Sequence, residues 1–421
     1  WPGSMPCIIN GEKSIRIAEY GASNTGKLKH AYRQGLGVRY GRIMQSIAGL
    51  HFNFSFTDEF WLRLQKTMEA NKQSLQDFKS EQYFALIRNF RRYSWLLMYL
   101  FGASPSLDKS FINGKAHSLD PFDDKGSYYK PYATSLRMGD LGYHNNAQSS
   151  LAICFNSLSN FITTLNKAIR TPYKPYEDIG LKRNDEFIQI NSNILQIENE
   201  YYSAIRPKRT TQQSETPRHA LNERGVEYIE VRCLDLNPFL ELGISAQQID
   251  FLDIFLSYCL LSESPLISDE DCIRLDQNFD AVVNRGREPK LEINGPNGAI
   301  SPQEWASQLV EEMSNVAATL DKGTEDSRYS KALGEQKAKI LHPELCPSAQ
   351  VLSIMREESL SWVNFAGELA FKHKSCLLSD FPNKESVLNE LSASAKQSFV
   401  DEQAIRTSDK VCFEDFLIAD K

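Results

Sequence analysis

The chain of 421 residues has no pair of cysteines at the Cys-x-x-Cys spacing that is typical of zinc sites. Its eight cysteines are scattered, which is the pattern of free or buried thiols in a reducing compartment rather than of a disulfide framework. The sequence also has no signal peptide and no apolar run approaching the roughly 20 residues that cross a bilayer. We therefore expect a cytoplasmic protein without a membrane segment.

The sequence also has no excess of positive charge. The net charge is −7 and the isoelectric point is about 5.7, whereas general nucleic-acid binders are normally basic. We therefore expect no nucleic-acid partner, although a local basic pocket for phosphates is compatible with this balance. Hydrophobic residues make up 41% of the chain, which is enough for a sizeable core.

One stretch with strand periodicity, from Gly41 to Phe56, carries much of the polar chemistry. Alternation along a strand separates two sets of side chains. The polar set is Gln45, Ile47, Gly49, His51, Asn53 and Ser55, and the apolar set is Leu50, Phe52, Phe54 and Phe56. The apolar set predicts a stripe that faces the core. Taken alone, the polar set is one solvated face of an amphipathic strand, and it becomes a site only if other segments bring complementary groups to it.

A second strand is predicted from Val226 to Leu234. Its alternation places Tyr228, Glu230 and Arg232 on one face, opposite an apolar face. The carboxylate and the guanidinium are either a neighbouring ion pair or part of a site. In the second case Glu230 is a ligand for Mg²⁺, and Arg232 offsets the charge of a phosphoryl group during transfer.

The loop Gly21-Ala-Ser-Asn-Thr-Gly-Lys27 matches the first seven positions of a phosphate-binding P-loop. The next residue is Leu28, where magnesium coordination needs a Ser or Thr hydroxyl. We therefore favour a tight loop beside a ligand pocket, with a plain surface turn as the alternative. Two short strands that turn at Asn10-Gly11 are expected before this loop, and a short helix through Tyr32 after it.

The rest of the chain is expected to be mainly helical. Short strands are predicted at 187–190 and 194–197, and the basic run 206–209 is either a solvated loop or a contact to nucleotide phosphates. Helices are predicted over 57–78, through Phe84 to Trp95, and over 158–169, 245–261, 269–285, 301–320, 348–374 and 385–399. We expect residues 1–240 to form the catalytic sheet region with inserted helices. Residues 241–421 are expected to form a helical region packed on it.

Eight segments together carry a resemblance that no single motif does. They are Tyr20-Gly-Ala-Ser-Asn-Thr-Gly26, Tyr32-Arg33, Gly49-Leu-His-Phe-Asn-Phe54, Leu100-Phe-Gly-Ala-Ser-Pro105, Pro131-Tyr-Ala-Thr-Ser-Leu-Arg137, Leu195-Gln-Ile-Glu-Asn-Glu200, Ile205-Arg-Pro-Lys-Arg209 and Glu227-Tyr-Ile-Glu-Val-Arg232. The chain resembles bacterial glutamate–cysteine ligase of the enteric type, densely as far as about Phe255 and more thinly beyond. The resemblance implies an α+β fold related to glutamine synthetase, with a curved antiparallel sheet and surrounding helices.

The resemblance also implies a reaction. In that family ATP drives the joining of the γ-carboxyl of L-glutamate to the amine of L-cysteine, through γ-glutamyl phosphate and with Mg²⁺ as cofactor. This is the first step of glutathione biosynthesis. The expected partners are these small molecules, and the expected state is a monomer. The choice of cysteine over a similar amino acid rests on the resemblance alone.

Site residues follow from the same resemblance. His51 and Glu230 resemble metal ligands, Arg232 resembles the residue that faces the transferred phosphoryl group, and Arg33 is expected to assist there. Residues that resemble the lining of the cysteine pocket are Tyr32, Leu36, Gln45, Ile47, Asn53, Arg137, Tyr143 and Tyr202. An arginine with tyrosine hydroxyls suits a substrate carboxylate, although each of these residues taken singly is more often structural.

One departure from the family affects these expectations. The family begins with a Glu-Arg-Glu-type strand and a further acidic motif, and this sequence has neither. We therefore expect a chain that lacks an N-terminal segment, with poor metal binding, an exposed sheet edge and negligible turnover. Two alternatives stay open. One is a non-catalytic remnant that binds an amino acid, and the other is a P-loop ATPase in which Lys27→Ala would abolish ATP binding.

Overall fold

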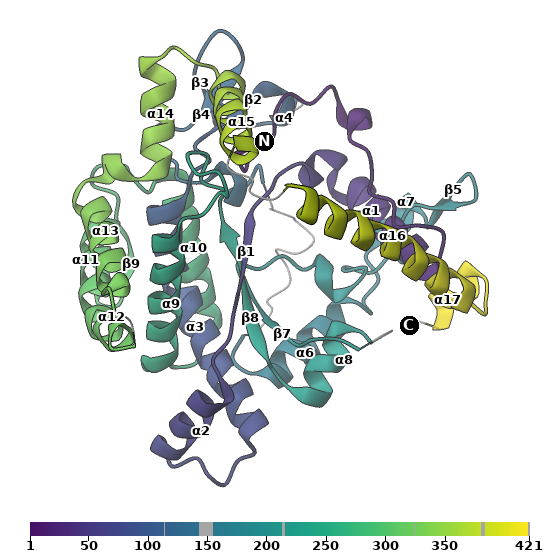
Figure 1. Ribbon diagram of the computed structural model, residues 1–421, viewed down its shortest axis with the longest axis horizontal. Helices are drawn as coiled ribbons and strands as arrows, with labels where there is room; N and C mark the ends of the chain where they lie inside the picture. The colour runs from purple at the N-terminus through teal and green to yellow at the C-terminus, as the bar shows by residue number, and fades with distance from the viewer. Residues whose placement is uncertain (113, 143–154, 213–214, 324, 380–383, 420–421) are drawn as a thin grey trace. The chain divides into compact units, whose positions relative to one another are not determined.

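The computed structural model describes residues 1–112, 114–142, 155–212, 215–323, 325–379 and 384–419. The chain divides into two compact units. Unit 1 comprises residues 1–8, 47–167 and 201–369, and unit 2 comprises residues 9–46, 168–200 and 370–421. Helices predominate and the strands form small antiparallel sheets, so the predicted α+β class is confirmed (Figure 1).

The sheet that carries most of the predicted chemistry lies in unit 1. It consists of β1 (Leu50–Phe54), β8 (Tyr228–Leu234) and β7 (Ile205–Lys208), in the antiparallel order β1-β8-β7 (Figure 1). Along β8, Ile229 and Val231 are fully buried, whereas the alternating residues Tyr228, Glu230 and Arg232 are only partly buried. The second predicted strand and its two faces are therefore confirmed.

The first predicted strand is much shorter than expected. Only Leu50–Phe54 is a strand, and the phenylalanines on its inner face are half-buried rather than buried. The chain before it forms the 3₁₀ helix η2 (Arg42–Gln45), which follows Gly41 at a φ of 87°. A positive φ ends the preceding helix and turns the chain. The alternation therefore does not extend back to Gln45 or Ile47, and the prediction that both share a strand face with His51 is wrong.

The remaining strands of unit 1 pair locally. They are β2 (Ser106–Asp108), β3 (Asp120–Pro121) and β4 (Ser127–Tyr129) in the order β2-β4-β3, and the hairpin β9 (Ile293–Gly295) with β10 (Gly298–Ile300). The helices are α2 (Asp58–Thr67), α3 (Leu75–Phe101), α4 (Lys109–Ile112), η3 (Leu136–Met138), α6 (Leu158–Ala168), α8 (Pro217–Arg224), α9 (Ala246–Leu261), α10 (Asp269–Arg285), α11 (Pro302–Glu312), α12 (Ser314–Asp321), α13 (Arg328–Leu341), η5 (Pro343–Leu345), α14 (Pro347–Glu357) and α15 (Trp362–Ser379). The boundary between the units falls within α6 and α15.

The core of unit 1 is built around α3, which packs against α9, α10 and the strands β7 and β8 (Figure 1). The predicted stripe of Phe84, Ile87, Phe90 and Trp95 is buried. The ring of Phe90 meets that of Phe255 edge-on, with centroids 5.8 Å apart. Burial of each such side chain contributes about 1.5–3 kcal/mol. The helix that supports the sheet is therefore firmly anchored in the core of the unit.

Helix starts were well predicted because their caps are local. The side chains of Thr57, Ser245 and Ser301 each accept a hydrogen bond from a backbone N–H in the first turn. Helix ends were predicted less well. The expected helices over 57–78, 301–320 and 348–374 each prove to be two helices. In the first and last cases the break contains a non-glycine residue with a positive φ, Glu69 or Ser359.

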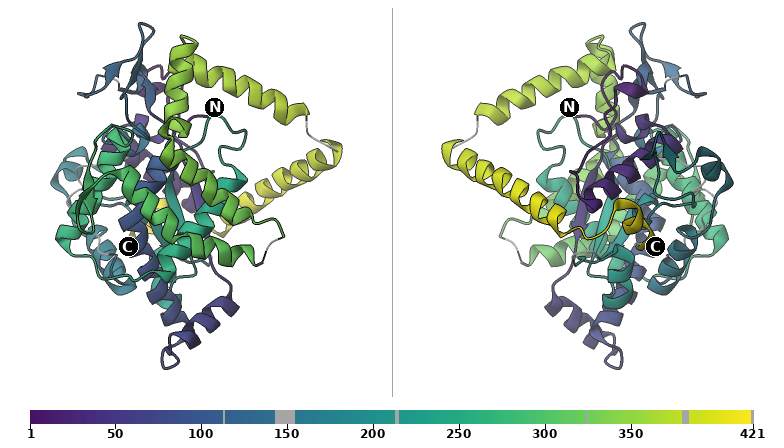
Figure 2. Two further views of the ribbon diagram at one scale, coloured as in Figure 1. Left: turned by 90° about the vertical axis from the view of Figure 1, so that its left-hand side faces the viewer. Right: turned by 90° about the vertical axis from the view of Figure 1, so that its right-hand side faces the viewer.

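Unit 2 consists of η1 (Glu12–Ser14), α1 (Asn24–Tyr40), η2, α7 (Lys174–Ile179), the hairpin β5 (Lys182–Arg183) with β6 (Glu186–Phe187), η4 (Glu198–Glu200), α16 (Lys384–Ser408) and α17 (Phe413–Ala419). Ala31, Ile190 and Leu417 form a small core. Helix α16, yellow-green in Figure 2, is a single long helix with no buried residue.

Several expected strands of unit 2 are not formed. The described residues 7–20 contain η1 instead of a hairpin, residues 194–197 are not a strand, and only Phe187 of 187–190 belongs to one. The loop from Gly21 to Lys27, which matches part of a P-loop, therefore has no strand before it, and this is further evidence against the P-loop alternative. A strand needs a partner, and a short apolar run cannot show whether one is present.

None of the described helices is long and apolar enough to cross a membrane. The β1-β8-β7 sheet and the helices α9–α14 fall in the same compact unit. The division of the chain into a catalytic region and a helical region at residue 240 stays a prediction.

Candidate active site

The β1-β8-β7 sheet places side chains from three strands in one row. Asn53 of β1 is opposite Glu230 of β8, which is opposite Arg206 of β7. Directly opposed residues of antiparallel strands point to the same face. The sheet therefore collects on one face an amide, a carboxylate and a guanidinium that are far apart in sequence.

The pairing of β1 with β8 has an extra residue on β8, as in a β-bulge, opposite the predicted metal ligand His51. The register of β1 against β8 shifts by one residue between Leu50 and Phe52, and His51 is the residue between them. Bulges commonly redirect a side chain near a site. Here Nδ1 of His51 lies 3.5 Å from Oε1 of Glu230, and the two predicted metal ligands are neighbours.

The charges around His51 favour its neutral form. Burial lowers the pKa of His51 below its ordinary value, and the positive charge of Arg232 lowers it further, whereas Glu230 acts in the opposite direction. An imidazole with a lowered pKa is neutral near pH 7 and has a lone pair available for a metal ion. Half of the His51 side chain is exposed, so an ion could reach it.

Two buried nitrogens of Arg232 donate no hydrogen bond to any described residue. Its Nε lies 3.5 Å from Oε2 of Glu230, and its guanidinium lies 5.1 Å from the ring centroid of Tyr202. Among the described residues, no group accepts a hydrogen bond from the buried Nε or Nη1 of Arg232. Buried donors without acceptors cost free energy. An anion placed against these nitrogens would satisfy them, which is the behaviour expected of a residue that faces a phosphoryl group.

Two further cationic side chains lie on this face of the sheet, and the sequence pattern did not predict their position. The basic run 206–209, expected in a loop, contributes Arg206 and Lys208 to the strand β7, opposite Glu230 and Tyr228. The solvated-loop interpretation is therefore wrong for these two residues. Burial, together with Arg206 and Arg232, lowers the pKa of Lys208, although Glu230 opposes this. The strand alternation that could have shown this is interrupted in sequence by Pro207, which a strand at the edge of a sheet tolerates.

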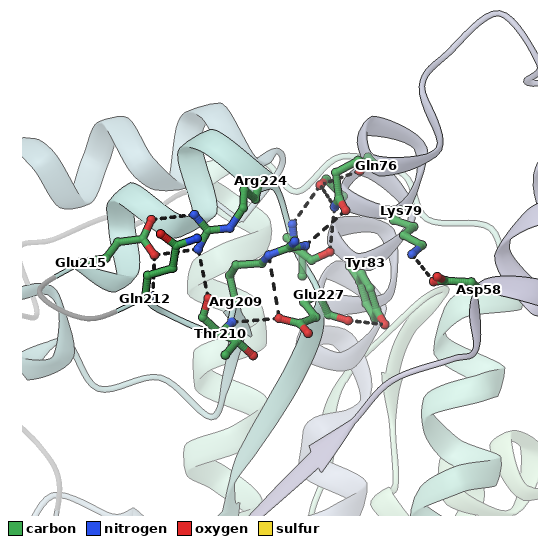
Figure 3. Close-up of polar contacts among 12 residues, drawn as sticks. Asp58, Gln76, Lys79, Tyr83, Arg209, Thr210, Gln212, Glu215, Arg224 and Glu227 are labelled. Atoms are coloured by element: carbon green, nitrogen blue, oxygen red, sulfur yellow. Dashed lines mark hydrogen bonds and ion pairs between the residues drawn. The ribbon is translucent and has the colours of Figure 1, made fainter. Parts of the chain in front are cut away.

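Polar contacts fix the end of β7 and the start of β8 (Figure 3). Arg209, directly after β7, forms an ion pair with Glu227, directly before β8. Nη1 of Arg209 also donates to Oε1 of Gln76 on α3 at 3.3 Å. The hydroxyl of Tyr83, also on α3, donates to the carbonyl of Glu227 at 3.1 Å (Figure 3). These contacts hold the basic strand and its central neighbour on α3.

Tyr202, predicted to line the cysteine pocket, lies beside Arg232. Its hydroxyl donates to the sulfur of Met138 at 3.2 Å and lies 3.5 Å from the carbonyl of Arg232. The ring of Tyr202 supports the guanidinium of Arg232 through a cation–π contact. Asn53 is exposed on the same face. Their contact with cysteine stays a prediction.

Arg137 is buried, with 1% of its side chain exposed. Its Nε donates to Oδ1 of Asp235 at 2.7 Å, and its Nη2 donates to the carbonyl of Cys233 at the end of β8. A Cβ on Gly49 would lie 2.6 Å from Nη1 of Arg137. This geometry supports a residue that positions the end of the sheet. Tyr143, predicted to share a pocket with Arg137, lies outside the described residues.

The other predicted pocket residues lie elsewhere in the chain. Ile47 is buried in the loop before β1. Tyr32, Arg33 and Leu36 lie on α1 of unit 2 within about one helical turn. Gln45 belongs to η2 of the same unit, and its Nε2 donates to the carbonyl of Arg33 at 3.2 Å. These four residues of unit 2 therefore belong to one local structure.

Comparison with known proteins identifies the family. A family model described as glutamate-cysteine ligase matches residues 1–282. The glutamate–cysteine ligase of Hahella chejuensis is 51% identical over 99% of this chain and 79% of its own length. That of Azotobacter vinelandii is 47% identical over 100% of this chain and 79% of its own length. The chain belongs to the glutamate–cysteine ligase family.

Solved structures agree with this assignment. The crystal structure of glutamate–cysteine ligase from Francisella tularensis in complex with AMP superposes with a TM-score of 0.91 at 34% identity, over 100% of this chain and 81% of that one. A bifunctional glutathione synthetase from Pasteurella multocida has a TM-score of 0.66 at 21% identity, over 89% of this chain and 42% of that one. The second match shows a shared fold.

The donors present fit a divalent ion in part. His51 and Glu230 are two adjacent donors, and Glu230 supplies the carboxylate oxygen that Mg²⁺ prefers. No group of three or more His, Cys, Asp or Glu side chains gathers in the part of the chain that the structure describes. Mg²⁺ usually keeps several waters and binds one or two carboxylates together with substrate phosphates. The two donors of this chain, His51 and Glu230, are therefore compatible with Mg²⁺ that arrives with a nucleotide.

Proposed function

We propose that this chain catalyses the ATP-dependent ligation of the γ-carboxyl of L-glutamate to the amine of L-cysteine, the first step of glutathione biosynthesis. The family supports this activity, because the relatives that match nearly the whole chain are named glutamate–cysteine ligases. The observation that carries the proposal for this chain is the environment of Arg232. This arginine lies beside the carboxylate of Glu230, on a sheet face with two further cations, and its buried Nε and Nη1 donate no hydrogen bond to any described residue.

The chemistry explains why such a cation is needed. A carboxylate is a poor acyl donor, so a γ-carboxylate oxygen of glutamate first attacks the γ-phosphorus of ATP, and ADP leaves with the electrons of the broken P–O bond. The cysteine amine then attacks the acyl carbon of γ-glutamyl phosphate, phosphate leaves, and the amine loses a proton. A fixed guanidinium stabilises the charge that develops on the phosphoryl oxygens. We assign this role to Arg232, with Arg33 as an assisting residue.

The proposed cofactor is Mg²⁺, held by His51 and Glu230. When bound, the ion would neutralise charge on the nucleotide phosphates. The lowered pKa of His51 keeps this ligand unprotonated without a need for high pH. The expectation of poor metal binding and negligible turnover from this chain is opposed to this proposal, and the experiment below decides between the two.

Cysteine is the proposed acceptor amino acid, and Tyr32, Leu36, Gln45, Asn53 and Tyr202 are proposed to contact it. We also propose a cytoplasmic monomer. The seven cysteines within the described residues are all free thiols, which agrees with a reducing compartment. Light scattering after size-exclusion chromatography measures the oligomeric state.

The deciding experiment measures ADP release from ATP, Mg²⁺ and L-glutamate, with and without L-cysteine, on the 421-residue chain. We expect ADP release that requires both amino acids, and a product with the mass of γ-glutamylcysteine. ATP hydrolysis that is indifferent to glutamate would refute the ligase. Binding of cysteine without any ADP release would favour the non-catalytic remnant. The structure does not favour that alternative, because an amino-acid binder has no need for an arginine that lies beside a carboxylate and whose buried Nε and Nη1 donate no hydrogen bond to any described residue.

A further inference from the structure

The C-terminal part of α1 is held by a buried ion pair that the proposed chemistry does not use. The side chains of Arg39 and Glu200 have no exposed surface, and Nη1 of Arg39 lies 3.1 Å from Oε1 of Glu200. Both residues belong to unit 2, as does all of α1. A buried ion pair adds little net stability, because removing both charges from water offsets their attraction. A role in positioning explains the pair better than a role in stability.

Arg39 joins α1 to the chain that leads to η4. Its Nε donates to Oε1 of Gln189 at 2.9 Å, and its terminal nitrogens donate to the backbone carbonyls of Asn191 and Asn193. Its guanidinium carbon lies 4.1 Å from the ring centroid of Tyr176. A planar guanidinium with its donors engaged fixes direction as well as distance. One side chain of α1 therefore defines how the helix is rotated against this segment.

Glu200, in η4, also bonds to α1 and to the segment before η4. Its Oε1 accepts a hydrogen bond from the hydroxyl of Tyr40, and its Oε2 accepts one from the backbone N–H of Gln196 at 2.6 Å. Burial and the neighbouring Glu200 carboxylate raise the pKa of Tyr40 well above its ordinary value. The phenol therefore keeps its proton and remains a donor to the carboxylate.

Gln196 connects this segment to the backbone of α1 by a hydrogen bond. Its Nε2 donates to the carbonyl of Tyr32 at 3.3 Å, and its Oε1 accepts from the N–H of Ile190 at 3.0 Å. Gly35 provides the space for this amide, since a Cβ there would lie 2.0 Å from Oε1 of Gln196. Gln196 is buried and bonded at both ends of its amide, so it cannot move aside easily.

Apolar packing does not place α1 by itself. The buried residues of this 17-residue helix are Asn24, Gly26, Ala31 and Gly35, none of which has a large apolar side chain. Glycine within a helix also lowers helix propensity. Hydrophobic contacts are non-directional, whereas the hydrogen bonds of Arg39 and Gln196 have defined geometry. The polar contacts therefore add direction to the apolar packing of Leu28, Ala31 and Tyr32 on the small core of unit 2, and they restrict the rotation and the axial position of α1.

We propose that Arg39, Glu200 and Gln196 form a positioning device for α1 in the ligation reaction. The device sets where the helix presents Tyr32, Arg33 and Leu36. Gln196 bonds the carbonyl of the first of these, and the clamped Gly35 directly precedes the last. This inference rests on the proposed function, in which these residues serve cysteine and the phosphoryl group. A displacement of about 1 Å of such residues can reduce the rate by about 10².

Two variants test the device in different ways. Gly35→Ala forces α1 and Gln196 apart, whereas Glu200→Gln keeps the shape of the side chain and removes its charge. We expect each to raise the KM for cysteine about tenfold and to lower kcat, while the KM for ATP stays within about twofold. Gly334→Ala is the matched control, because it adds the same methyl group to a helix where no atom lies within 4 Å of the new Cβ. It should leave all three constants unchanged.

A double variant, Gly35→Ala with Gln196→Ala, shows whether Gly35 acts through Gln196. In a Gln196→Ala background the clash is absent, so adding Gly35→Ala should produce little further change in the KM for cysteine. A non-additive result of this kind identifies direct coupling. Circular dichroism confirms that each variant is folded before kinetics are measured.

The outcomes separate this inference from the proposed function. If the unaltered chain shows no ligation, the proposed function fails and the positioning role fails with it. If the unaltered chain ligates, unchanged Michaelis constants in both Gly35→Ala and Glu200→Gln would overturn the positioning role alone. A fall in melting temperature without a change in the KM for cysteine would also overturn the positioning role, because it would show that the residues act on stability only.

Discussion

Arg232 is the residue whose surroundings agree most closely with a catalytic role. Its buried Nε and Nη1 donate no hydrogen bond to any group among the described residues. We predict that Arg232→Lys lowers kcat for ADP release by about 10²-fold, because a lysine keeps the charge but loses the planar set of donors. Steady-state kinetics with saturating ATP and glutamate measure the effect.

The control for this substitution is Arg63→Lys. The side chain of Arg63 is 79% exposed and forms a surface ion pair with Glu59, so the change should leave kcat unaltered. An Arg232→Lys enzyme with kcat within twofold of the unaltered chain would show that the guanidinium does not act on the phosphoryl group.

Arg137 illustrates a buried ion pair with a structural consequence. Both oxygens of Asp235 are used, since Oδ1 accepts from Arg137 and Ser135, and Oδ2 accepts from Ser104 and the N–H of Ala103. We predict that Asp235→Ala lowers the free energy of unfolding by about 3–5 kcal/mol, because it leaves the guanidinium charge buried without its partner. Urea denaturation followed by tryptophan fluorescence measures the loss.

The matched substitution for Asp235→Ala is Glu59→Ala, in an ion pair whose side chains are more than 70% exposed. Such pairs contribute about 0–1 kcal/mol. Equal losses in the two variants would contradict the structural role of the Arg137–Asp235 pair.

The sequence predicted part of the candidate site for a clear physical reason. Glu230 and Arg232 were placed on one face because they lie on one strand, and strand alternation is local. Their proximity to His51 depends on the pairing of β1 with β8, which local pattern does not contain. The place of Arg206 on a strand was not predicted, because that strand is short and includes a proline. The burial of Arg137 follows from Asp235, almost a hundred residues away in sequence.

At the scale of elements, α9 and α13 meet at a cluster of charges. Burial, with a contribution from the Asp250 charge, raises the pKa of Asp253 on α9 to about 6, although Arg328 on α13 opposes the shift. A carboxyl group with a raised pKa in the folded state binds its proton more tightly there than in the unfolded chain. Its contribution therefore makes the free energy of unfolding fall as the pH rises from about 4 to about 6.

Asp253→Asn should remove this pH dependence. Above pH 7 the variant should be more stable than the unaltered chain by about 1 kcal/mol, allowing for solvent screening of a partly exposed group. Thermal unfolding at pH 5 and pH 8 measures the difference. Asp124→Asn, at an exposed position, is the control. A stability difference between Asp253→Asn and the unaltered chain that is the same at both pH values would show that Asp253 titrates normally.

Helices were predicted better than strands because helix signals are local. An N-cap such as Ser245 and an apolar stripe such as that of α3 lie within a single segment. A strand is stabilised by a partner that a segment does not reveal. The expected hairpin at Asn10-Gly11 has turn residues but no pairing among the described residues, and the chain forms η1 instead.

At the scale of the whole molecule, burial is very unevenly distributed. Seventeen residues of α3 are buried, from Phe78 to Phe101. Helix α16 has none, and Leu388, Leu391 and Phe399 on it are more than half exposed. Helices that gain little from packing are marginally stable in water, and local opening follows such differences in packing.

We therefore predict that the backbone amides of α16 exchange with solvent much earlier than those of α3. Hydrogen exchange with mass spectrometry measures this peptide by peptide, and α9, which is buried along most of its length, should resemble α3. Since opening of α16 exposes almost no new apolar surface, its exchange should also depend weakly on added urea. Slow exchange in α16, comparable to that in α3, would contradict the prediction and show that its apolar side chains are covered in solution.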